Sequence, residues 1–240
     1  MELAPGIQAI GGKAGGRVHA FLIGDGDDLT LIDTLYETDG RLVLQEIRRL
    51  GRSITDVRRI VLTHGHRSHL GGLAELKRQS GATVYSHEWE ADIIAGERKA
   101  QAVTIVPRRP LRTYFPFQVG LALGLGGHPP CPVDETLTDD DEIGGLHVLH
   151  TPGHTPGHLA FYSEKAGVLL SGDSISTWPT FDAGWAAFNL NQREQRASIR
   201  RMAALEPKVV GVGHGSPIAQ DAADRVHSLV EAEPAVTSRG

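Results

Sequence analysis

The stretch that decides the fold is LTHGHRSHLGG, residues 62–72, which holds three histidines within six positions: His64, His66 and His69. Alternate residues of an extended segment point to the same side, so His64 and His66 face one cavity. His69, at the start of the helix that follows, can face the same cavity. Because imidazole is the commonest metal ligand among side chains, this spacing predicts a metal site.

Outward from this stretch, short apolar runs alternate with helical patterns, and DGD at residues 25–27 is a hairpin turn signal. Predicted strands cover residues 17–24, 28–34, 57–64, 82–87, 146–154, 158–163, 167–173 and 208–215. Predicted helices cover residues 38–50, 69–81, 88–97, 191–205 and 219–231, and Thr38 and Asp39 are the expected caps of the first. Two successive β-rich blocks, each closed by helices, predict an α/β fold, a four-layer sandwich of similar halves.

Polar side chains stand at the ends of four predicted strands: the histidine stretch, His154, Asp173 and His214. Strand-end loops are where open α/β architectures place their functional residues. A lone histidine is more often a satisfied structural residue than a ligand, but the joint pattern predicts one shared site. Three imidazoles bound to a Zn²⁺ leave its fourth position open for water. The ion lowers the pKa of that water to about 7. Asp173 is expected to orient or bridge that water.

Four motifs carry a resemblance to a known family. THGHRSHLGG, HTPGHTPGH, SGDS and GVGHGSP resemble, in this order, the metal-binding motifs of the metallo-β-lactamase-fold hydrolase superfamily, in its lactonase-like and glyoxalase II-like branch. The likeness covers nearly the whole chain, and it implies an αββα sandwich with a dinuclear metal site. LIDT, with Asp33, resembles the structural strand that precedes these motifs. Residue by residue, the resemblance implies His64, His66 and His154 for the first metal, His69 and His214 for the second, and Asp173 bridging both.

Ser68 departs from the family pattern H-x-H-x-D-H, since it stands where the aspartate is expected. A neutral hydroxyl is a poor ligand for a divalent ion and a poor general acid. We therefore predict one firmly bound zinc and a second that is weak or absent. Iron and manganese also suit imidazole and carboxylate ligands.

Length and composition limit the classes of function that the chain can have. The 240 residues predict a single domain, and the net charge of −5 gives no general attraction to nucleic acid or to anionic membranes. The single cysteine excludes an internal disulfide, and the N-terminus has no basic segment followed by an apolar one, so a cytoplasmic protein is expected. Monomer and homodimer both remain open.

Residues 98–134 fit no clean period and are rich in proline, which predicts a cap or lid inserted over the site. Apolar side chains from this segment and from the segment after SGDS are the candidate walls of a substrate pocket: Tyr114, Phe115, Phe117, Leu121, Trp178 and Phe181. We expect Arg67 to face solvent rather than an anionic substrate. His158 either supports the ligands or lies on a strand surface.

These features favour a metal-dependent hydrolase in which metal-bound hydroxide attacks the carbonyl of an ester, lactone or thioester of a fairly apolar small molecule. A phosphodiesterase is an alternative, but it normally uses two metals, and Ser68 argues against that. A β-lactam hydrolase is a further alternative. The remaining one is a metal-binding or small-molecule-binding protein whose catalysis Ser68 has impaired.

Overall fold

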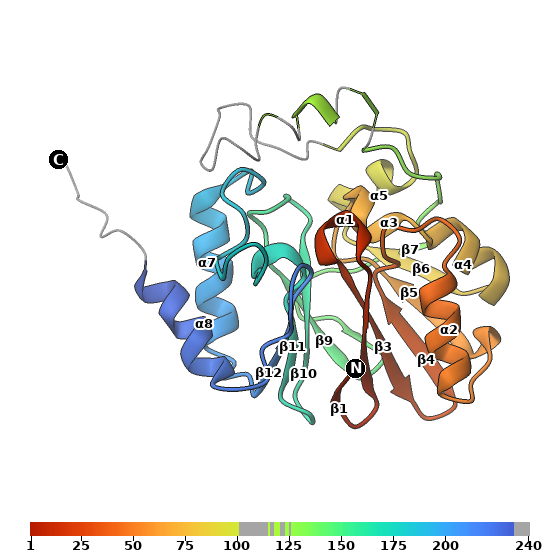
Figure 1. Ribbon diagram of the computed structural model, residues 1–240, viewed down its shortest axis with the longest axis horizontal. Helices are drawn as coiled ribbons and strands as arrows, with labels where there is room; N and C mark the ends of the chain where they lie inside the picture. Colours follow the sequence, from red (N-terminus) through yellow and green to blue (C-terminus); the bar gives the residue numbers. More distant parts are fainter. Residues whose placement is uncertain (101–114, 116–117, 121–122, 125, 233–240) are drawn as a thin grey trace.

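Two β-sheets lie face to face in the centre of the computed structural model, and helices cover their outer faces (Figure 1). The structure describes residues 1–100, 115, 118–120, 123–124 and 126–232. Helices α2 (Arg41–Arg49) and α4 (Leu73–Ser80) cover one sheet, and α7 (Gln192–Ala203) and α8 (Ala222–Glu231) cover the other. The four layers confirm the predicted αββα sandwich.

The first sheet holds seven strands in chain order: β1 (Glu2–Ala4), β2 (Ile7–Gly11), β3 (His19–Asp25), β4 (Asp28–Ile32), β5 (Val57–Val61), β6 (Thr83–Ser86) and β7 (Glu135–Thr136). The first four strands pair antiparallel, and β4 to β7 pair parallel. The carboxyl ends of parallel strands meet at one edge of a sheet, so the loop after β5 opens at that edge.

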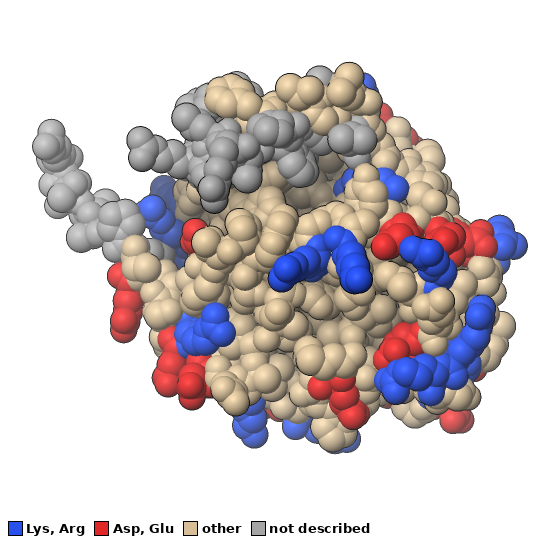
Figure 2. All heavy atoms as spheres, viewed as in Figure 1, with Lys and Arg blue, Asp and Glu red and all other residues tan. Residues whose placement is uncertain are grey.

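The second sheet has the order β12-β11-β10-β9-β8, with β8 (Glu142–Ile143), β9 (Leu146–His150), β10 (Leu159–Ser163), β11 (Val168–Leu170) and β12 (Val209–Gly211). Only β11 and β12 pair parallel within it. The shorter elements are α1 (Ala14–Arg17), α3 (Arg67–Leu70), α5 (Glu88–Ile94) and the 3-10 turns η1 (Ile54–Asp56) and η2 (Gly172–Ser174). In the described part of the chain, no helix combines the length and apolarity needed to cross a membrane. Figure 2 shows acidic and basic side chains interspersed on the viewed face.

Alternation along the strands creates the layers. On β3, Ala20 and Leu22 pack toward α2 and α4, whereas Phe21 and Ile23 pack between the two sheets. Successive strand residues point to opposite faces, so a strand that is apolar throughout belongs in a middle layer. A third cluster, which includes Leu169, lies between the second sheet and the helices α7 and α8.

The predicted helix over residues 69–81 is wrong in one respect, because it is two helices, α3 and α4, separated by Gly71 and Gly72. The amide of Gly71 donates to the Leu35 carbonyl, and a Cβ on Gly71 would lie 2.2 Å from the Tyr36 carbonyl oxygen. The chain therefore approaches the segment after β4 too closely for any side chain at residue 71. This contact anchors the histidine stretch to the first sheet.

Other differences from the prediction include the cap of α2 and the first two strands, and α1, β7 and β8 were not predicted either. Residue Gly40, with φ +62°, caps helix α2, although Asp39 still accepts a hydrogen bond from the Arg41 amide at 3.1 Å. Strands β1 and β2 were not predicted, because the N-terminal residues carry turn-forming Pro5 and Gly6 between two very short runs.

Candidate metal centre

Six side chains singled out from the sequence meet at one edge of the sandwich. They come from the loop after β5, from α3, from the loop between β9 and β10, from η2 and from the loop after β12. Their ligand atoms form two groups in which all atoms lie within 4.8 Å of one another: His64, His66, His154 and Asp173, and then His69, Asp173 and His214. Asp173 belongs to both groups, so the structure brings together all the residues to which the sequence assigned ligand roles.

The Asp173 carboxylate lies at the centre of the cluster. Its Oδ2 is 3.3 Å from His214 Nε2 and 3.5 Å from His154 Nε2, and its Oδ1 is 3.3 Å from His69 Nε2. His64 Nε2 lies 3.8 Å from Asp173 Oδ2. Ligands about 2.0–2.1 Å from a tetrahedral zinc are about 3.3 Å apart, so these separations have the scale of a coordination shell.

The buried polar atoms of the cluster test whether a cation fits. His64 Nε2 is buried and has no hydrogen-bond partner among the described residues, and the buried atoms His69 Nε2 and Asp173 Oδ1, 3.3 Å apart, have no neighbour of this kind there except one another. Leaving a buried polar group without a hydrogen bond costs about 1–3 kcal/mol. A cation held between these atoms would satisfy all of them, so the residues fit a divalent metal.

Burial and the central carboxylate shift the pKa values of the clustered histidines in opposite directions. Burial lowers the pKa of His64 and of His154 well below the usual range, so both are neutral imidazoles able to bind a metal. Burial also lowers the pKa of His69, but the carboxylates of Asp173 and Asp33 outweigh it and raise that pKa to about 10. Burial raises the pKa of Asp173, and the stronger effect of His214 and His69 holds it well below the usual range.

Asp33 orients two of the histidines. Its fully buried carboxylate accepts hydrogen bonds from the Thr63 amide at 2.9 Å, from the Thr63 hydroxyl at 2.8 Å and from His69 Nδ1 at 2.7 Å. Because the Thr63 hydroxyl donates to Asp33, it accepts from His64 Nδ1 at 2.9 Å. Both imidazoles therefore present Nε2 to the cluster, an arrangement that raises ligand basicity in metal sites.

We expect Asp33→Asn to destabilise the protein by about 3 kcal/mol, because the amide nitrogen places a donor against a buried donor. Metal affinity should fall about 10–100-fold, since His64 and His69 lose their orientation. Denaturant unfolding and a metal titration measure the two effects. Asp27→Asn, in the exposed turn before β4, is the matched control. Unchanged metal affinity in Asp33→Asn would contradict the orienting role.

The loop after β12 and the turn η2 have supports of their own. His214 Nδ1 donates to the Gly16 carbonyl at 2.9 Å, which leaves Nε2 facing Asp173. His158 is fully buried, and its Nε2 accepts the Asp173 amide at 3.0 Å. Burial lowers the pKa of His158 to about 3, so it is a neutral acceptor. Of the two roles considered for His158, the structure selects support of a candidate ligand.

Ser68 and Arg67 lie beside the cluster on α3. The Cβ of Ser68 would be 3.3 Å from a Cβ on Gly15, so Ser68 faces α1, the turn whose Gly16 carbonyl holds His214. The Arg67 guanidinium lies 4.3 Å from the Tyr36 ring centroid and donates to the Tyr36 carbonyl at 2.6 Å. Arg67 is thus packed on Tyr36 and does not contact the cluster. The expectation that Arg67 faces solvent was therefore wrong.

The predicted pocket walls fall in different places. The Trp178 and Trp185 rings are 5.3 Å apart, and the Trp185 ring lies 5.9 Å from that of His214, so this aromatic pair borders the second ligand group. Phe181 lies elsewhere, packed under the Arg225 guanidinium in the cluster with α7 and α8. Phe115 is 55% exposed. Tyr114, Phe117 and Leu121, and much of the predicted cap, lie outside the described residues.

Sequence reasoning missed two contributors to the site. Asn189 Oδ1 lies 3.4 Å from His154 Nδ1, and Glu90 on α5 accepts hydrogen bonds from the Gly65 and Gly157 amides. Burial raises the pKa of the Glu90 carboxyl above its usual value, against the lowering effect of its hydrogen-bond donors. Neither residue stands in a motif, and Glu90 is one of several acidic residues in its helix, so no local signal marks it.

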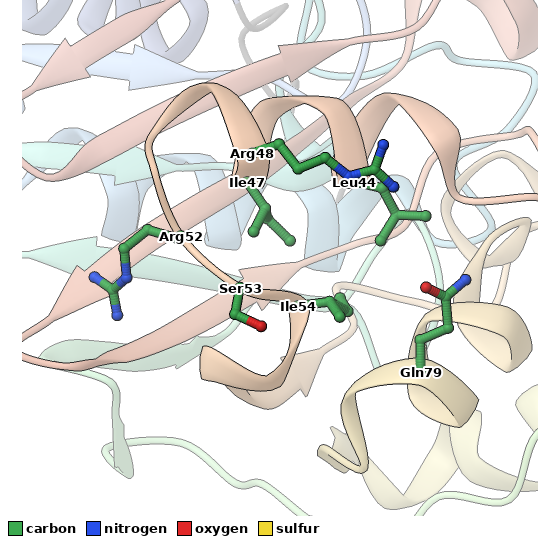
Figure 3. A pocket seen from close by; sticks show the side chains of 7 residues that line it. All are labelled: Leu44, Ile47, Arg48, Arg52, Ser53, Ile54 and Gln79. Carbon is green, nitrogen blue, oxygen red and sulfur yellow. The ribbon is translucent and has the colours of Figure 1, made fainter.

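A cavity of about 330 Å³ lies between helix α2, the turn η1 and helix α4 (Figure 3). Turn η1 precedes β5, whereas the histidine stretch follows it. It is lined by Leu44, Ile47, Arg48, Arg52, Ser53, Ile54 and Gln79. Arg52 is engaged by Asp56 at 2.8 Å, and the Ser53 hydroxyl accepts from the Thr55 amide within the same turn. The lining therefore serves the local structure of η1 and holds none of the candidate ligands.

The fold is a two-sheet αββα sandwich, and its strand-end loops bring five histidines around one shared aspartate. This combination defines a class of metal-binding proteins. A family model described as the metallo-beta-lactamase superfamily matches residues 14–214 of this chain. The chain belongs to this superfamily, as the four motifs predicted.

Individual relatives agree with this assignment. The probable metallo-hydrolase YflN of Bacillus subtilis (strain 168) is 25% identical over 242 residues, covering 90% of this chain and 86% of the relative. A hydroxyacylglutathione hydrolase of Methylobacillus flagellatus is 27% identical over 150 residues, covering 62% of this chain and 44% of that enzyme. The crystal structure of the metallo-beta-lactamase family protein TTHA1429 from Thermus thermophilus superposes with a TM-score of 0.70 at 28% identity, covering 96% of this chain and 80% of that one.

Proposed function

We propose that this protein is a metal-dependent hydrolase that cleaves an ester, lactone or thioester bond in a fairly apolar small molecule. The observation that carries the proposal is the buried cluster in which Asp173 stands 3.3–3.8 Å from four imidazoles. Its buried polar atoms that lack hydrogen-bond partners among the described residues have no structural use that would offset their cost.

The residues of the cluster and its surroundings would have different roles in the reaction. His64, His66, His154 and Asp173 would hold the first metal, for which zinc is our choice over iron or manganese, and His69, Asp173 and His214 would hold a second. A bound divalent ion supplies Lewis acidity and activates water at neutral pH. Asp173 would hold the proton of the attacking water in position, and Trp178 and Trp185 would contact the acyl part of the substrate. Ser68 cannot act as a general acid, so water or another residue would supply the leaving-group proton.

The named relatives support the reaction class. One of them is named a probable metallo-hydrolase and another a hydroxyacylglutathione hydrolase, so a thioester belongs among the substrates to be tested. The observation that favours a second candidate, a metal-binding or small-molecule-binding protein with impaired catalysis, is Ser68. Phosphodiesters and β-lactams belong in the same assay for comparison.

Metal removal separates these functions. The purified protein is expected to contain at least one equivalent of metal and to hydrolyse aryl esters, lactones or thioesters, and a chelator should abolish the activity until metal is restored. Elemental analysis before and after chelation, beside a panel that includes a phosphodiester and a β-lactam, measures this. Stoichiometric metal without turnover of any substrate would favour the binding protein. A protein that takes up no metal on reconstitution would contradict both.

A further inference from the structure

Helix α5 places a buried carboxylate between two loops of the candidate metal centre. Glu90 is 1% exposed. Its Oε2 accepts a hydrogen bond from the Gly65 amide at 2.9 Å, and its Oε1 accepts one from the Gly157 amide at 3.0 Å. A single side chain therefore satisfies two buried backbone amides from segments 92 positions apart in the sequence.

The fit of Glu90 requires glycine at both amides. A Cβ on Gly65 would lie 2.9 Å from Glu90 Oε2 and 2.8 Å from Ile93 Cγ2. A Cβ on Gly157 would lie 2.8 Å from Glu90 Cγ and 2.9 Å from Oε1. Both sets of distances are shorter than van der Waals contact, so the two glycines and the carboxylate form one closely fitted unit.

The two loops belong to different sheets. Gly65 separates the candidate ligands His64 and His66 after β5, and Gly157 lies three residues after His154, between β9 and β10. His66 Nδ1 and His154 Nε2, one from each loop, are 3.0 Å apart. Any drift between the loops would separate the imidazoles that the first metal requires within one coordination shell.

We propose that Glu90 is a positioning residue that clamps the loop of His64 and His66 to the loop of His154, and so preorganises the first metal site across the two sheets. It acts through backbone amides and touches neither metal nor substrate. The clamp itself stands on the hydrogen bonds, while its benefit to metal binding rests on the proposed function.

Glutamine is the sharpest substitution because it keeps the shape of the side chain. A carboxylate offers acceptors to both amides, whereas the amide of Glu90→Gln turns an N–H toward one of them. Glu88→Gln makes the same chemical change two residues earlier on α5, at an exposed side chain, and is the matched control.

Two measurements test the clamp. In metal-free protein, Glu90→Gln is expected to raise hydrogen exchange at the Gly65 and Gly157 amides together, by at least about 10-fold. Titration with Co²⁺ against a competing chelator should show the first equivalent bound about 10–100-fold more weakly, with an altered visible absorption band. Glu88→Gln should match the wild type in both.

Several outcomes would overturn the inference. Faster exchange confined to α5, with both loops unchanged, would exclude the clamp whether or not the protein binds metal. Unchanged Co²⁺ affinity and spectrum in a Glu90→Gln protein that unfolds at a lower temperature would make Glu90 merely structural. If Glu90→Gln does not fold, Gly65→Ala, which presses on the same carboxylate, is expected to weaken Co²⁺ binding, and wild-type affinity there would refute the proposal. A wild type that takes up no Co²⁺ contradicts the proposed function, while the exchange measurement still decides the clamp.

Discussion

Asp173→Asn is expected to lose its metal and to hydrolyse substrates at least about 10³-fold more slowly than the wild type. The substitution keeps the shape of the side chain but removes the charge of the carboxylate that both ligand groups share. Two unit charges about 4 Å apart attract by about 4 kcal/mol at an effective dielectric constant of about 20, which corresponds to about 10³ in affinity. A divalent ion would lose more than this.

Metal content by elemental analysis and kcat/KM on the best substrate of the panel measure the two losses. Asp27→Asn, which removes the same charge in an exposed turn, should retain metal and activity. Full metal content in Asp173→Asn would mean that the imidazoles alone hold the ion and that Asp173 is not a ligand. Full activity would remove the central role that the proposed function gives to this carboxylate.

The ligand cluster was predictable because its signals are local. His64, His66 and His69 stand within one stretch, and the remaining candidate ligands each end a recognisable apolar run. Strand-end residues of neighbouring strands meet at one edge whatever the intervening loops do. Six positions could therefore be assigned to one site before any contact was known.

The supports of the cluster were harder to predict, because they are long-range. Asp33 contacts His69 across 36 positions, and Asn189 lies near His154 across 35. Glu90 looks like any other acidic residue of an amphipathic helix until the backbone amides that it meets are known. Hydrogen bonds of this kind depend on how two sheets pack, and periodicity carries no information about that.

Local packing also explains the errors. Nothing in HLGGLAELKRQSG signals that the chain near Gly71 lies against the Tyr36 carbonyl, so one helix was predicted where there are two. Arg67 was expected in solvent, because its aromatic partner is distant in sequence. Phe181 was expected in a pocket wall because it is a large apolar residue close to SGDS in the sequence. It packs under Arg225 instead, because the segment after η2 turns toward α8.

Ser68→Asp is expected to add a second tightly bound metal to a protein in which we expect one firmly bound metal. Ser68 precedes His69 on α3 and faces α1, whose Gly16 carbonyl fixes His214, so a carboxylate at residue 68 would stand on the side of the second ligand group. In the wild type that group has two imidazoles and one shared carboxylate. One further carboxylate near a divalent ion should tighten the second equivalent at least about 100-fold.

Stepwise metal titration with elemental analysis measures this gain, and kcat should rise at least about 10-fold if residue 68 then also supplies the leaving-group proton. Ser68→Asn separates the two effects, because it adds a ligand oxygen without charge or acidity. Ser53→Asp is the charge control, since aspartate preserves the cap of η1 at the other end of β5. Two equivalents of equal affinity in the wild type would show that Ser68 does not limit the second site. If Ser68→Asn gains metal but no activity while Ser68→Asp gains both, the limit on hydrolysis lies in the supply of that proton rather than in the number of ions.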